Sequence, residues 1–153
     1  MTPKPIFYFI INPKSGKGNP NGLAELIHAS ARSFEGDVRI VFTKGQGDIY
    51  KISKHALNEG AAVVAVAGGD GSVHEAAQAL VNSKTALGVI PLGSGNGFAN
   101  HFKIPGDKKK AIQNILNHIA IRIDTLKINN RICVSTAGFG FDAHIAHLFS
   151  TYG

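Results

Sequence analysis

The feature that most constrains the fold is a regular alternation of short apolar runs with segments of helical periodicity. Four apolar runs predict buried strands, at residues 6–11, 38–42, 62–67 and 87–90. Segments whose apolar residues recur every three or four positions predict helices, at residues 23–34, 48–60, 73–81 and 112–119. The expected helix starts are polar, at Asn19-Pro20, Asp48 and Asp107. This order predicts an α/β domain in which helices cover both faces of a mainly parallel sheet.

The pattern changes after residue 120. Apolar and polar residues alternate over 121–128 and again over 131–134, on either side of Asn129-Asn130. Alternation around such a turn predicts a β-hairpin. We expect this region, up to residue 153, to open a second, antiparallel domain.

The length of the chain is enough for one domain, and its charge limits the kinds of molecule that it is expected to bind. The chain has 153 residues and a net charge of +6, which fits either an ordinary basic surface or a partner that carries phosphate. Lys108-Lys109-Lys110 is a run of basic residues, but the others are dispersed and are not interleaved with aromatic residues, so nucleic acid is not expected. The triplet could help a peripheral contact with an anionic membrane, although a solvated helix start explains it equally well.

Cysteine and histidine give no sign of a metal site. Cys133 is alone, which excludes an intramolecular disulfide and a multi-cysteine metal site. The seven histidines are scattered, so we predict no zinc site. The apolar run at 6–11 is too short for a membrane span and lacks a cleavage site, so we expect a cytoplasmic protein, with any membrane contact peripheral at the inner face.

Three glycine-rich segments follow the first, third and fourth predicted strands, at residues 12–18, 68–71 and 92–97. Ligands bind beyond the carboxyl ends of the strands in sheets of this kind. Glycines let a backbone approach a phosphate closely, and a helix that starts directly afterwards adds partial positive charge. The three loops therefore predict a phosphate-binding site, although the Walker A and Gly-x-Gly-x-x-Gly strings are absent.

The second loop places Asp70 among three glycines. A carboxylate repels phosphate, so Asp70 would orient the loop, face the nucleotide sugar, or reach phosphate through a metal ion. Ser72 and Glu75 also have the spacing of a capping box, which a helix can use with no ligand present. Ser94, in the third loop, could cap the next helix or contact a phosphate, and Asn96 suits a turn with positive φ.

The three loops, in this order and spacing, resemble the diacylglycerol kinase catalytic domain, which is shared with sphingosine kinases and bacterial lipid kinases. The matching strings are Asn12-Pro13-Lys14-Ser15-Gly16, Gly68-Gly69-Asp70-Gly71-Ser72, Pro91-Leu92-Gly93-Ser94-Gly95-Asn96, Ile123-Asp124 and Gly138-Phe139-Gly140-Phe141-Asp142. The resemblance implies a phosphofructokinase-like, three-layer α/β nucleotide-binding domain over 1–120. Residues 121–153 would then be a β-hairpin region that begins an incomplete β-sandwich domain.

The resemblance also implies a reaction, in which the γ-phosphoryl group of ATP is transferred to a lipid hydroxyl with the help of Mg²⁺. The residues it implies for ATP binding are Asn12, Pro13, Lys14, Ser15, Gly16, Thr43, Gly68, Gly69, Asp70, Gly71, Ser72, Val73, His74 and Ser94. The catalytic base and the Mg²⁺ ligands of the family lie in the second domain, and no residue of this chain matches them. The chain by itself could therefore bind nucleotide without transferring a phosphoryl group.

Two departures from the family pattern and two other functions stay open. His74 stands where asparagine is usual, and Gly97 where aspartate is frequent. NAD kinase shares the Gly-Gly-Asp-Gly string, but the loops at 12–16 and 91–96 favour a lipid kinase. A non-catalytic nucleotide-binding module is the alternative from another class, with exposed β edges that could form a homodimer.

Overall fold

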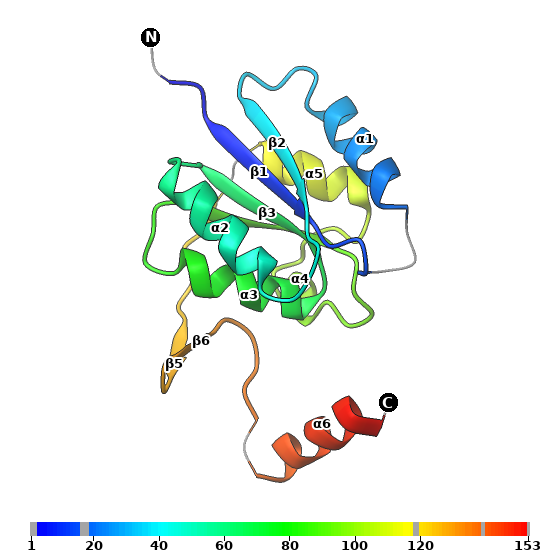
Figure 1. Ribbon diagram of the computed structural model, residues 1–153, viewed down its shortest axis with the longest axis vertical. Helices are drawn as coiled ribbons and strands as arrows, with labels where there is room; N and C mark the ends of the chain where they lie inside the picture. Colours follow the sequence, from blue (N-terminus) through cyan, green and yellow to red (C-terminus); the bar gives the residue numbers. More distant parts are fainter. Residues whose placement is uncertain (1–2, 16–18, 118–119, 139, 153) are drawn as a thin grey trace.

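The centre of the fold is a four-stranded parallel sheet with the strand order β2-β1-β3-β4 (Figure 1). The strands are β1 (Ile6–Ile11), β2 (Asp37–Phe42), β3 (Val63–Gly68) and β4 (Ala86–Pro91). The computed structural model describes residues 3–15, 19–117, 120–138 and 140–152. β1 and β3 are the two inner strands, and their nearly continuous burial explains their apolar sequences.

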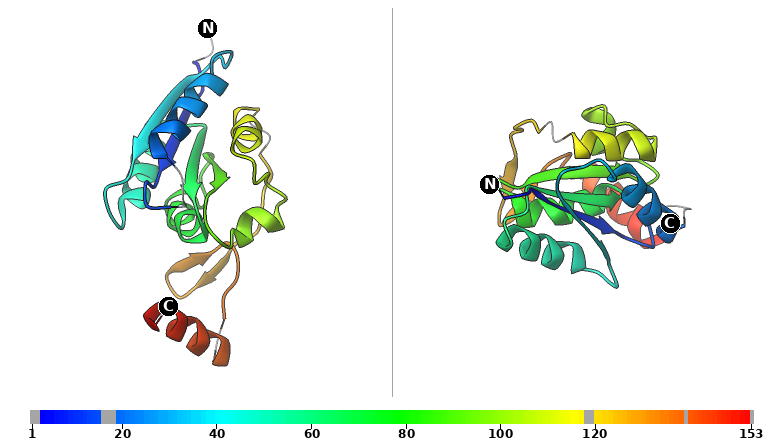
Figure 2. Two further views of the ribbon diagram at one scale, coloured as in Figure 1. Left: turned by 90° about the vertical axis from the view of Figure 1, so that its right-hand side faces the viewer. Right: turned by 90° about the horizontal axis from the view of Figure 1, so that it is seen from above.

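Two helix layers cover the sheet, as Figure 2 shows. Helices α1 (Pro20–Ser30) and α5 (Lys108–Leu116) pack on one face, against side chains such as Phe7 and Phe9. Helices α2 (Asp48–Asn58) and α3 (Asp70–Leu80) pack on the other face, against Ile10 and its neighbours. Successive strand residues point to opposite faces, so each strand supplies both cores. The predicted α/β architecture is confirmed.

Two of the three predicted N-cap residues cap their helices, and the third does not. The Asn19 side chain accepts a hydrogen bond from the Asn21 N–H at 3.0 Å, and Asp107 accepts one from Lys110 at 2.9 Å. Asp48 was expected to cap α2 but is its first residue. Its carboxylate instead accepts bonds from two backbone N–H groups of the preceding loop, which lower the pKa of the Asp48 carboxyl.

The predicted hairpin is present and shorter than expected. Strands β5 (Leu126–Ile128) and β6 (Arg131–Cys133) pair antiparallel, whereas residues 121–125 belong to no strand. The Gln78 side chain of α3 holds the hairpin with two hydrogen bonds. Its Nε2 donates to the Ile132 carbonyl at 2.6 Å, and the Ile132 N–H donates to its Oε1 at 2.9 Å.

Helix α6 (Phe141–Tyr152) was not predicted. It lies apart from the α/β body in Figure 1 and in the left view of Figure 2, and Phe141, Ile145 and Leu148 are exposed along it. Among the helices that the structure describes, none is long and apolar enough to cross a bilayer. The domain boundary at residue 120 stays a prediction.

A polar cluster joins β1, β2 and the end of α2 at the amino-terminal part of the sheet. The Tyr8 hydroxyl donates to the Glu59 carboxylate, and Arg39 Nη1 donates to the Tyr8 hydroxyl at 3.0 Å. The bond from Tyr8 lowers the pKa of the Glu59 carboxyl, and the Arg39 charge acts in the same direction. Glu59 therefore stabilises the fold at pH values above the ordinary pKa of glutamate. This stabilisation is lost as the pH falls through the lowered pKa of the Glu59 carboxyl.

We expect Glu59→Gln to lower Tm at neutral pH, because Tyr8 and Arg39 lose their charged partner. The difference from the wild type should shrink in acid, where the wild-type carboxyl is protonated. Thermal melting followed by circular dichroism over a pH series measures both effects, with the exposed Glu35→Gln as the control. A difference in Tm that does not change with pH would contradict the assigned role.

We expect Gln78→Leu to release the hairpin, because leucine has a similar size but cannot bond the Ile132 backbone. Hydrogen exchange measured by mass spectrometry should become faster over 126–133, with little change in β1 and β3. Gln113→Leu, at an exposed position of α5, is the matched control. Unchanged exchange over the hairpin would show that other contacts hold it.

Candidate functional site

The described parts of the three glycine-rich loops meet at the carboxyl edge of the sheet. The chain leaves β1 towards α1 on one face and leaves β3 towards α3 on the other. Because these neighbouring strands send their chains in opposite directions, a crevice opens between their carboxyl ends. The predicted phosphate-binding loops therefore flank the position where such sheets bind ligands.

Helix α3 begins earlier than predicted, directly at Asp70 with Gly69 as its N-cap residue. Ser72 consequently lies inside the helix, and the expected capping box with Glu75 is not formed. The Glu75 carboxylate instead accepts a hydrogen bond from the Tyr50 N–H at the start of α2, at 3.1 Å. Glu75 thus joins two helices, and no side chain caps α3.

Asp70 connects the second loop to the third. Its two carboxylate oxygens accept hydrogen bonds from the backbone N–H groups of Gly97 and Phe98, both at 2.9 Å. These groups begin α4 (Gly97–His101), so Asp70 serves as a cap supplied from a distant part of the sequence. A β-carbon at Gly97 would lie 3.8 Å from both carboxylate oxygens, an ordinary contact.

The third loop is held by Asn96, which is the N-cap residue of α4 and has a φ of 50°. Its side chain accepts a bond from the Gly93 N–H at 2.9 Å and donates one to the Gly93 carbonyl at 2.6 Å. Ser94 is exposed and does not cap α4, because Asn96 occupies the N-cap position and the Asp70 carboxylate accepts hydrogen bonds from the first N–H groups of the helix.

Close packing of two backbones explains Gly69 in the second loop and Gly93 in the third. A β-carbon at Gly93 would lie 2.7 Å from the Gly69 Cα atom, a distance that no side chain can accommodate. A β-carbon at Gly68 would collide with the Ser72 side chain. The second and third loops therefore need Gly69 and Gly93 for their mutual approach.

The first loop forms a tight turn at the end of β1. The Lys14 N–H donates to the Asn12 side chain, and the Ser15 N–H donates to the Asn12 carbonyl, both at 3.0 Å. Pro13 and Lys14 are exposed on this turn, and Gly16 lies outside the described residues. Thr43 is buried beside the end of β1, where its N–H donates to the Ile11 carbonyl at 3.0 Å.

A cavity of about 310 Å³, here called the loop cavity, lies between the first and third loops on the face covered by α1 and α5. Its lining residues are Ile11, Asn12, Ser15, Asn19, Pro20, Leu23, Pro91, Leu92, Gly93 and Lys108. Two of the predicted site residues, Asn12 and Ser15, belong to it. Lys108 was not predicted, because it lies outside the three loops in the sequence.

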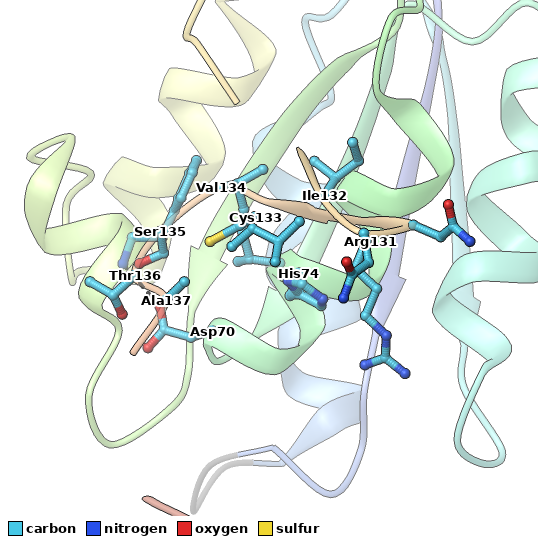
Figure 3. A pocket seen from close by; sticks show the side chains of 14 residues that line it. Asp70, His74, Arg131, Ile132, Cys133, Val134, Ser135, Thr136 and Ala137 are labelled. Atoms are coloured by element: carbon cyan, nitrogen blue, oxygen red, sulfur yellow. Dashed lines mark hydrogen bonds between the residues drawn. The ribbon is translucent and has the colours of Figure 1, made fainter. Parts of the chain in front are cut away.

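A second cavity of about 490 Å³, the hairpin cavity, lies between α3 and the hairpin (Figure 3). Its lining residues are Asp70, Val73, His74, Phe98 and residues 128–137. Asp70 lies beside Thr136 and Ala137 at one end, and Arg131 lies at the other end. The predicted residues Asp70, Val73 and His74 thus line this cavity, whereas Thr43 and Ser94 line neither.

Comparison with known proteins agrees with this geometry. Residues 7–128 match the family described as "Diacylglycerol kinase catalytic domain". A relative from Cronobacter sakazakii, described as "Probable lipid kinase YegS-like", is 33% identical over 141 residues, which are 87% of this chain and 46% of that protein. A "Probable lipid kinase YegS" from Escherichia coli is 36% identical over 110 residues, or 67% of this chain and 36% of that protein.

The fold has a counterpart among solved structures. The crystal structure of a diacylglycerol kinase from Bacillus anthracis superposes with a TM-score of 0.76 at 26% identity, covering 86% of this chain and 46% of that one. This chain thus spans less than half the length of these relatives. Its parallel sheet, its antiparallel hairpin and its three glycine loops are those of one family, and the chain belongs to the diacylglycerol kinase catalytic domain family.

Proposed function

We propose that this chain supplies the ATP-binding part of a lipid kinase, which transfers the γ-phosphoryl group of ATP to a lipid hydroxyl. The observation that carries this proposal is the meeting of three glycine-rich loops at the crevice between β1 and β3. Membership of the diacylglycerol kinase catalytic domain family supports the same reaction class. No observation favours a second function.

The loop cavity is our candidate for the nucleotide. Polar groups of Asn12 and Ser15 line it, and Gly93 brings the backbone of the third loop to its wall. A glycine cradle of this kind fits phosphate groups, because uncovered N–H groups can approach the oxygens closely. Gly69 packs against Gly93 at this wall, where a β-carbon on Gly93 would lie 2.7 Å from the Gly69 Cα atom.

The described residues could hold a magnesium ion only together with the phosphates of bound ATP. They contain no cluster of three or more histidine, cysteine or acidic side chains. Each Asp70 oxygen already accepts one backbone hydrogen bond and keeps capacity for another partner. Since Mg²⁺ commonly binds through one or two carboxylates and the substrate phosphates, Asp70 is the residue here that could contact it.

The hairpin cavity is our candidate for the acceptor lipid. Its lining includes apolar side chains such as Phe98 and Ile132, and Asp70 forms part of its wall near the glycine loop. An acceptor hydroxyl at this end would lie close to phosphates bound at the loop. Asp70 is engaged with α4 by both oxygens, so we assign it to positioning and expect the catalytic base outside this chain.

Isothermal titration of the chain with ATP, with and without Mg²⁺, tests the proposal. We expect saturable binding that Mg²⁺ strengthens, and much weaker binding of NAD, the control ligand for a related kinase class. Binding of NAD in preference to ATP would contradict the lipid kinase proposal and favour the NAD kinase class instead. A folded chain that binds neither ligand would contradict the nucleotide site.

We expect Asp70→Asn to weaken ATP binding and also to lower Tm by a few degrees. The amide offers one acceptor oxygen where the carboxylate offers two, so one N–H group at the start of α4 loses its partner. Titration and thermal melting of the same sample separate the two effects. A loss of Tm with unchanged affinity would limit Asp70 to a structural role.

A further inference from the structure

Among the described residues that line the loop cavity, Lys108 is the one that carries a formal charge. The other described lining side chains are apolar or carry neutral polar groups, and none of them is acidic. The hairpin cavity differs, because both Asp70 and Arg131 line it. The loop cavity therefore has an uncompensated positive charge, which suits an anionic ligand.

Lys108 forms no ion pair with any residue that the structure describes. The three ion pairs of the described residues join Asp37, Arg39, His55 and Glu59, and none includes a lysine. Lys108 is also the first residue of α5, and a cation in the first turn of a helix opposes the helix dipole. Helix stability therefore does not explain a lysine at this position.

We propose that Lys108 binds the phosphate groups of the nucleotide, as a contact supplied by α5 in addition to the three glycine loops. This inference rests on the proposed function, since it takes the loop cavity as the nucleotide site. An ammonium group pairs with phosphate oxygens through charge-assisted hydrogen bonds, and its flexible stem lets it reach across the cavity mouth. Lys109 and Lys110 follow it directly but do not line the cavity.

Neighbouring lysines provide a matched control. Lys108→Gln and Lys109→Gln remove the same charge from the same exposed turn, so they change the overall field almost equally. We expect Lys108→Gln to raise the Kd for ATP about tenfold or more, as for the loss of a hydrogen bond to a charged group. Lys109→Gln should change it less than about twofold, because solvent screens exposed charges. Lys108→Arg should retain most of the affinity.

The measurement is isothermal titration of the whole chain with ATP, together with the rise in Tm caused by inorganic triphosphate, a probe that has phosphates and no base. The rise should be smaller in Lys108→Gln than in Lys109→Gln, while both variants melt like the wild type without ligand. Equal effects of the two variants, or an unchanged Kd in Lys108→Gln, would overturn the assignment. Absence of ATP binding by the wild type would overturn the proposed function itself and the Lys108 contact with it.

Discussion

The arrangement of the site depends on the carboxylate of Asp70. Its two hydrogen bonds cross from the loop after β3 to the start of α4, and they are charge-assisted and hence stronger than ordinary backbone bonds. A carboxylate in a loop proposed to bind phosphate is unfavourable by itself, but the N–H groups of Gly97 and Phe98 partly compensate its charge. Asp70 can therefore stand next to a glycine cradle because a second loop provides its partners.

The two cavities differ in the charges that line them. The loop cavity combines apolar side chains with Asn12, Ser15, Asn19 and Lys108, whereas the hairpin cavity contains Asp70, Arg131 and much apolar surface. Under the proposed function, a charged nucleotide and an apolar acceptor approach the carboxyl edge of the sheet from its opposite faces. Asp70 lines the hairpin cavity, where it positions α4 and could contact a metal ion brought by the nucleotide.

The sequence predicted the parts of the fold that repeat a local pattern, such as the strands and the caps at Asn19 and Asp107. It did not predict partners set by tertiary contact. Glu75 has the spacing of a capping box yet bonds Tyr50, because α3 begins one turn earlier and α2 packs beside it. The charge of Lys108 in the loop cavity follows from sheet topology, which places α5 beside the first loop. Helix α6 was not predicted, and its apolar residues are exposed because it lies apart from the α/β body.

The attachment of the hairpin through Gln78 has an implication for how the family can diverge. Gln78 forms hydrogen bonds with the backbone N–H and the backbone carbonyl of Ile132. Every amino acid except proline has both of these groups. Substitutions in β6 can therefore accumulate without displacing the hairpin, provided that the strand keeps its backbone course. Substitutions can thus reshape one wall of the hairpin cavity, and under the proposed function the choice of acceptor, while Gln78 keeps that wall in place.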